Sequence, residues 1–71
     1  MNKHEWIEQI RKRFKQGARV ELVYTSDPYT RLKPGDTGKV VFVDDMGTVH
    51  INWDNGSQLG MVPGEDELRI L

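Results

Sequence analysis

The sequence predicts a mainly β protein in which a five-stranded small barrel follows one N-terminal amphipathic helix. Two turns of one chemistry, Asp-Met-Gly-Thr and Asp-Asn-Gly-Ser, divide residues 38–62 into three consecutive antiparallel strands. Short apolar segments at 20–24 and 68–71 add two more strands, and an apolar stripe at helical spacing precedes them all. Because closing a sheet removes its exposed edges, we expect a strongly bent sheet that closes on itself.

The length of the second turn decides which side chains share a face of the sheet. A three-residue loop that ends on a left-handed Gly56 pairs Ile51 with Leu59 and gathers the apolar side chains on one face. A two-residue loop would instead place Trp53 opposite Gln58 and mix polar and apolar side chains on both faces. We therefore predict the three-residue loop.

The same rule, applied to the first turn at 45–47, gives a strand that is apolar on both faces. It pairs Val43 with Val49. It also pairs Val41 with Ile51. An antiparallel strand with one wet face should alternate, so we expect either a bulge within this strand or a cover over its second face. The N-terminal helix is the obvious cover.

Residues 1–17 predict an amphipathic helix that begins at about residue 3. Asn2 is a good N-cap, and Glu5 follows it at the spacing of a capping box. Gly17 is expected to end the helix. We expect the helix to pack on the barrel formed by residues 18–71, so that both belong to one folding unit. The apolar stripe that would make this contact consists of Trp6, Ile7, Ile10 and Phe14.

Length and composition exclude several classes of protein. A chain of 71 residues has room for one domain with a small core. It contains no cysteine, which excludes a disulfide framework and a thiolate zinc site. No apolar run is long enough to span a bilayer, and the amino terminus lacks the pattern of a signal peptide. We expect a cytoplasmic protein without membrane attachment.

Charge is unevenly distributed along the chain. Residues 1–19 carry six Lys and Arg against two Glu, a net of +4, whereas residues 20–71 carry four against nine Asp and Glu, a net of −5. This division confines any phosphate-facing patch to the helix. The cations at the carboxyl end of the helix also complement its macrodipole. The candidate phosphate-facing residues are Arg11, Lys12, Arg13 and Lys15.

A long loop is expected at 25–36, because it contains an Asp-Pro and a Pro-Gly pair and no sustained apolar period. Loops of this length often carry function. Tyr29 either presents itself to a partner or folds back with Leu32 over the open end of the barrel. The candidate partner-binding residues are Tyr24, Tyr29, Arg31 and Trp53.

The chain carries no catalytic or cofactor-binding signature. Its two histidines, His4 and His50, have no motif around them that pairs a base with a nucleophile. The Asp residues of the two turns lack the spacing of a calcium loop. The acidic run at 65–67 is either a solvated turn or a docking surface for a basic partner segment. We expect a protein that is not an enzyme and binds no cofactor or metal.

Three stretches, DPYTRLKPGDTG, VDDMGTVHINWDNGS and LGMVPGEDE, resemble in order and spacing a bacterial family catalogued as domain of unknown function forty-three fourteen. More loosely, LKPGDTGKVVFVDD is similar to strands of SH3-like barrels of the KOW, Tudor and Mib-type groups. The resemblance implies an SH3-like fold in small bacterial or mobile-element proteins. It implies no active site, so no functional residue is carried over from it.

Two classes of function remain open. The first is a protein-interaction module in which the barrel holds a peptide or another subunit through its exposed aromatic residues and acidic loops. The second is nucleic-acid binding, with the helix cations on phosphates and an aromatic residue stacked on a base. The negative charge of residues 20–71 favours a protein or peptide partner over nucleic acid. The sequence leaves the oligomeric state open.

Overall fold

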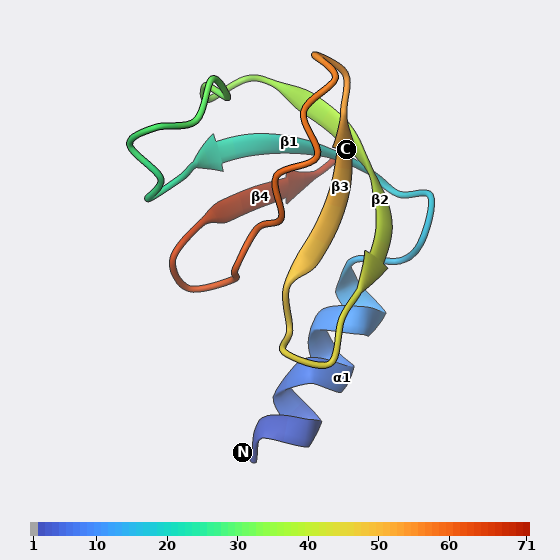
Figure 1. The fold of residues 1–71 in the computed structure, drawn as a ribbon. Helices are drawn as coiled ribbons and strands as arrows, with labels where there is room; N and C mark the ends of the chain where they lie inside the picture. The colour runs from blue at the N-terminus through green and yellow to red at the C-terminus, as the bar shows by residue number, and fades with distance from the viewer. Residues whose placement is uncertain (1) are drawn as a thin grey trace.

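A computed structural model describes residues 2–71, which form one helix and a single antiparallel sheet of four strands (Figure 1). The sheet has the order β3-β2-β1-β4 and is open. The predicted mainly β class with one N-terminal helix is confirmed. The elements are α1 (Lys3–Arg13), β1 (Arg19–Tyr24), β2 (Thr37–Val43), β3 (Val49–Trp53) and β4 (Glu67–Ile70).

The predicted fifth strand, within residues 57–62, is not a regular strand, and the predicted closure of the barrel is not confirmed. Its register against β3 is as predicted at both ends. The amide of Trp53 donates to the carbonyl of Ser57 at 2.9 Å, and Val49 forms an isolated antiparallel bridge with Met61. Between these ends the backbone of Leu59 is bonded to side chains. Its carbonyl accepts from Trp53 Nε1 at 2.9 Å, and its amide donates to the Ser57 hydroxyl at 3.3 Å. These two bonds use the groups that a ladder pair with Ile51 would need.

Both predicted three-residue turns are present. The amide of Asp44 donates to the carbonyl of Thr48 at 3.0 Å across the first, and the amide of Gly56 donates to the carbonyl of Trp53 at 2.9 Å in the second. Gly47 and Gly56 have φ values of 89° and 91°, the left-handed region that glycine adopts without strain. Local turn chemistry therefore sets the path of the chain here.

A β-bulge in β2 explains how a strand with apolar residues at consecutive positions fits this sheet. Val43 pairs with Val49 as predicted, but the register shifts between Val40 and Phe42, so Val40 rather than Val41 faces Ile51. The predicted pair of Val41 with Ile51 is wrong. The bulge keeps Val40 and Val43 in the core and turns Phe42 outward, where half of it is exposed.

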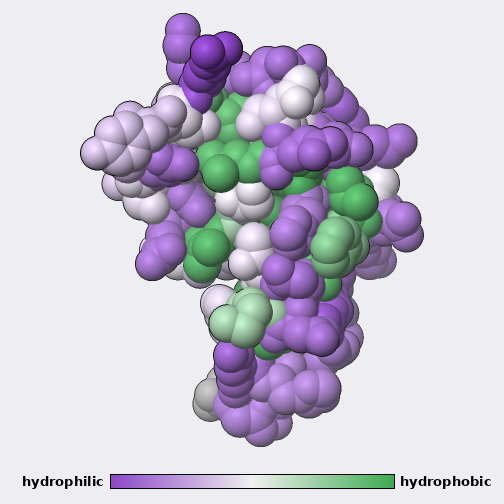
Figure 2. Space-filling model, in the orientation of Figure 1, coloured by the Kyte–Doolittle hydropathy of each residue, from purple (hydrophilic) through white to green (hydrophobic). Residues whose placement is uncertain are grey.

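The helix packs on the sheet through the predicted stripe. Asn2 caps it by accepting a hydrogen bond from the amide of Glu5 at 2.9 Å. The helix ends at Arg13, before the predicted position at Gly17, because Phe14 leaves helical geometry and enters the core. Trp6 is 36% exposed and lies beside the β2–β3 turn. Ile7, Ile10 and Phe14 are each no more than 6% exposed. In Figure 2, the visible surface at the lower end of the molecule, where the helix lies, is mostly hydrophilic.

The buried core joins the helix, the four strands and the long loop. Leu32 of the loop is 5% exposed and covers the core, whereas Tyr29 is 92% exposed. Of the two alternatives for this loop, folding back holds for Leu32, whereas Tyr29 stays exposed. The core cluster comprises Ile10, Phe14, Val20, Leu22, Leu32, Val40, Val43, Val49, Ile51, Trp53, Met61 and Leu68.

Candidate functional site

A groove of about 450 Å³ lies between the end of α1, the end of β1 and the turn that precedes β4. Its floor consists of buried apolar side chains from three segments. Its rim combines an exposed aromatic residue, a proline, acidic residues and one arginine. The floor residues are Phe14, Met61 and Leu68, and the rim residues include Arg13, Tyr24, Pro63, Glu65 and Glu67.

The bulge at the end of β1 places Tyr24 on the rim of this groove. Leu22 pairs with Leu68, but Tyr24 pairs with Glu67, so Val23 is the extra residue. Tyr24 is 57% exposed. An aromatic ring above an apolar floor is a typical feature of protein interfaces.

Asp66 holds the acidic turn in place. One carboxylate oxygen accepts from the Thr25 hydroxyl and the Ser26 amide, both at 2.9 Å, and the other accepts from the Val62 amide at 2.9 Å. Burial raises the pKa of Asp66, but these hydrogen bonds outweigh it and the pKa lies below its ordinary value. Asp66 therefore has a structural role. Its neighbours Glu65 and Glu67 are exposed and can face a partner.

The structure separates the four predicted partner-binding residues. Tyr24 lies at the groove, whereas Tyr29 stands in solvent on the long loop. Arg31 borders a different depression of about 530 Å³, beside the turn at 55–57. Trp53 is 3% exposed and belongs to the core, so its predicted place on a binding surface is wrong. Its indole N–H donates a hydrogen bond to the segment that follows β3 and is therefore not available to a partner.

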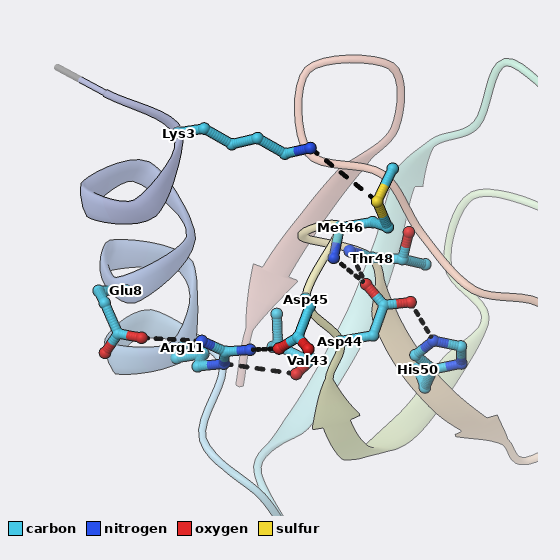
Figure 3. A network of polar contacts seen from close by, with 9 residues as sticks. All are labelled: Lys3, Glu8, Arg11, Val43, Asp44, Asp45, Met46, Thr48 and His50. Carbon is cyan, nitrogen blue, oxygen red and sulfur yellow. Dashed lines mark hydrogen bonds and ion pairs between the residues drawn. The ribbon is translucent and has the colours of Figure 1, made fainter.

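The structure also divides the four predicted phosphate-facing cations. Arg11 donates to Glu8 and to Asp45, each at 2.8 Å, and its Nε lies 3.4 Å from the carbonyl oxygen of Val43 (Figure 3). Hydrogen bonds to the two carboxylates raise the pKa of the Arg11 guanidinium. Arg11 therefore ties the helix to the β2–β3 turn. Lys12, Arg13 and Lys15 are exposed.

Arg13 lines the groove, a position that the sequence did not indicate. Its guanidinium carbon lies 5.1 Å from the centroid of the Phe14 ring, within the range of a cation–π contact. The structure thus brings one residue of each predicted set, Arg13 and Tyr24, to the same groove. The sequence offered no signal for this, because the two residues lie on different elements.

A second polar cluster fixes the β2–β3 turn (Figure 3). Asp44 accepts from the amides of Met46 and Thr48 at 2.9 Å through one oxygen, and its other oxygen lies 2.8 Å from His50 Nε2. These hydrogen bonds lower the pKa of Asp44, and the bond with His50 has the largest effect. The His50 ring stacks on Phe42 with centroids 4.4 Å apart. His50 thus holds a turn and a neighbouring ring in place.

Acidification is expected to destabilise the protein through Asp54, whose pKa is lowered to about 2 by its hydrogen bonds to Arg19 and then Thr37. Because the folded-state pKa lies below the ordinary 3.8, the stabilisation is complete above pH 3.8 and is lost as the pH falls toward about 2. Urea unfolding across this range should show a smaller pH-dependent loss for Asp54→Asn than for the wild type. Identical pH profiles would contradict this role.

The fold and the groove define a small, mainly β domain with a docked N-terminal helix and one mixed apolar and acidic groove. The chain belongs to the family described as Domain of unknown function (DUF4314), whose model matches residues 3–71. This confirms the resemblance noted in the sequence. No curated protein and no solved structure matches the chain.

Two further observations concern residues 2–71. Within them, no helix combines the length and the apolar character that crossing a membrane requires. Their His, Asp and Glu side chains form no group of three or more that is placed to hold a metal ion.

Proposed function

We propose that this protein is a non-catalytic interaction module of SH3-like type, which binds an extended segment of another protein in the groove beside Tyr24. The path of the chain supports an SH3-like arrangement. The segment 57–61 is bonded to β3 at both of its ends, and it then leads into β4 at the opposite edge of the sheet. The segment thus connects the two edges of the sheet, which is the connection that closure into a small barrel requires.

The observation that carries the proposal is the composition of the groove. Tyr24 is more than half exposed, although it borders a floor of fully apolar, buried side chains. Tyr is one of the residue types that most often contribute a large part of the binding free energy at protein interfaces. Glu65 and Glu67 on the rim form no ion pair among residues 2–71. They favour a segment that carries a basic residue beside an apolar one.

The arrangement of charges supports a protein partner over nucleic acid, the alternative. Arg11 is engaged with Glu8 and Asp45, so only part of the predicted phosphate-facing set is available. The acidic rim residues Glu65 and Glu67 would repel phosphates at the groove itself. The whole chain has a net charge of −1.

Selection of a displayed library of random short peptides on the full-length protein tests the proposal. We expect Tyr24→Ala to weaken binding of a selected, fluorescently labelled peptide at least about tenfold, because an aromatic anchor is lost. Tyr29→Ala is the matched control, since Tyr29 is 92% exposed and lies outside the groove. It should change the affinity less than about twofold. Failure to select a peptide, or equal effects of the two substitutions, would overturn the proposal.

The same preparation, titrated with single- and double-stranded DNA and RNA at two salt concentrations, tests the alternative. We expect no binding tighter than about 10 micromolar at physiological ionic strength. A submicromolar affinity that falls steeply with salt would instead favour nucleic acid. Loss of that affinity on changing Lys12, Arg13 and Lys15 to Glu would assign it to the helix.

A further inference from the structure

We propose that the partner segment binds as an additional β-strand along the free edge of β4, an inference that rests on the proposed function and specifies its binding mode. The sheet has two edges, formed by β3 and β4. The β3 edge is bonded to the segment 57–61 at Trp53 and at Val49. In Figure 1, β4 lies beside β1 at the border of the sheet. Among residues 2–71, β4 pairs with β1 alone.

The register identifies the backbone groups on this free edge. The amide of Leu71 donates to the carbonyl of Arg19 at 3.0 Å. Since hydrogen-bonded and non-hydrogen-bonded pairs alternate in an antiparallel ladder, Arg69 also faces β1. The amides and carbonyls of Leu68 and Ile70 therefore point away from β1. These four groups form a short template for an added strand.

The surface along this edge is hollow, and β4 itself contains neither Lys nor Pro. A further depression of about 440 Å³ borders β4 and shares Arg13, Glu67 and Leu68 with the groove. Ile70 is 41% exposed. Natural edge strands are commonly protected by short length, by charged side chains, by Pro or by a covering segment, and of these β4 has its length of four residues and two charged side chains. The charged residue in the middle of β4, Arg69, forms an ion pair with Glu21 of β1, so its side chain is directed along the sheet toward β1 and its charge stays at the edge.

The side chains along the edge of β4 indicate which kind of segment would bind there. A strand paired with Leu68 and Ile70 would direct alternate side chains into the groove, whose floor accepts apolar groups. The unpaired Glu65 and Glu67 lie at the start of β4 and would attract Lys or Arg at that end of the segment. The occupant is thus an extended peptide of another protein with an apolar residue followed or preceded by a basic one.

A second copy of this chain is a poorer occupant of the edge. The symmetric antiparallel register that uses the backbone groups of both Leu68 and Ile70 is centred on Arg69. It would place the two Arg69 side chains directly opposite each other, and like charges in that position are destabilising. The geometry therefore favours a different protein.

Amide hydrogen exchange on the full-length protein, with and without the peptide selected above, tests this binding mode. In the free protein, the Leu68 and Ile70 amides should exchange faster than the amides of Arg69 and Leu71, which face β1. With the peptide bound, exchange at Leu68 and Ile70 should slow at least about tenfold more than at Arg69, because new ladder hydrogen bonds form.

Two substitutions at residue 70 distinguish the contribution of its backbone amide to peptide binding from that of its side chain. Ile70→Pro removes an edge amide that β1 does not use, and should weaken peptide binding at least about tenfold. Ile70→Ala keeps the amide and should weaken binding less than about threefold. Should the proline variant fail to fold, hydrogen exchange of the wild type decides the question.

Each outcome bears on a different proposal. Binding that requires Tyr24 without added protection at Leu68 and Ile70 overturns the edge pairing and leaves the groove as the binding site. Protection at the edge with no effect of Tyr24→Ala supports the added strand and overturns the role of Tyr24. Absence of any selected peptide overturns both.

Discussion

Deletion of residues 1–16 is expected to lower the melting temperature sharply and to increase dye binding to exposed apolar surface. The reason is that Ile7, Ile10 and Phe14 are buried, and that Ile10 and Phe14 belong to the same core cluster as the sheet. Removing a buried Phe alone typically costs about 3–5 kcal/mol. A core of this size supports only about 3–5 kcal/mol in total. Thermal unfolding followed by circular dichroism measures the loss.

A pair of point substitutions in the full chain tests the same contact. Phe14→Ala should destabilise the protein by about 3 kcal/mol or more. Trp6→Ala is the control on the same stripe, and it should cost less because Trp6 is 36% exposed, against 4% for Phe14. A truncated chain that melts at the unchanged temperature would show that the helix contributes nothing to the stability of the sheet.

Gly38→Ala is expected to destabilise the protein by roughly 2–3 kcal/mol, at the upper end of the usual cost of overpacking. A Cβ at this position would lie 2.7 Å from Ile51 Cγ2, 2.9 Å from the carbonyl oxygen of Asn52 and 3.0 Å from Trp53 Cα. Two of these atoms belong to the backbone of β3. Relief therefore requires β2 and β3 to move apart at the centre of the sheet. Chemical denaturation of the purified variant measures the change.

Gly56→Ala is the matched control for this prediction. Gly56 has a φ of 91°, but a Cβ there would meet no atom within 4 Å. The substitution should cost only about 1 kcal/mol, the strain of a left-handed alanine. If Gly38→Ala costs no more than Gly56→Ala, the close approach of the strands is not what requires glycine at residue 38.

Sequence reasoning located the groove only in part. The sequence predicts Tyr24 as a partner-binding residue and an acidic run at 65–67, but no local pattern connects them. Asp66 shows why, because its bonds to Thr25 and Val62 join two segments that are far apart in the chain. The sequence also could not indicate that Asp66 is occupied within the fold while its two acidic neighbours are exposed.

The features that the sequence determined by itself depend on bonds between near neighbours. The cap at Asn2 bonds to an amide three residues away, and the turns that end at Gly47 and Gly56 close over a few residues. The apolar periodicity likewise predicts the helix stripe. These features are local, so the free energies of their interactions depend on neighbouring residues and not on the rest of the fold.

Tertiary structure decided which of two chemically acceptable positions each ambiguous side chain takes. Trp53 has both an apolar ring and a donor, and only the position of Leu59 in the fold provides an acceptor for that donor. Phe42 was turned outward because the bulge let Val40 and Val43 both reach the core. The edge of β4 stayed free because no segment of residues 2–71 beyond β1 pairs with it. Such outcomes depend on packing between distant segments, which compete for the same buried space and the same backbone groups.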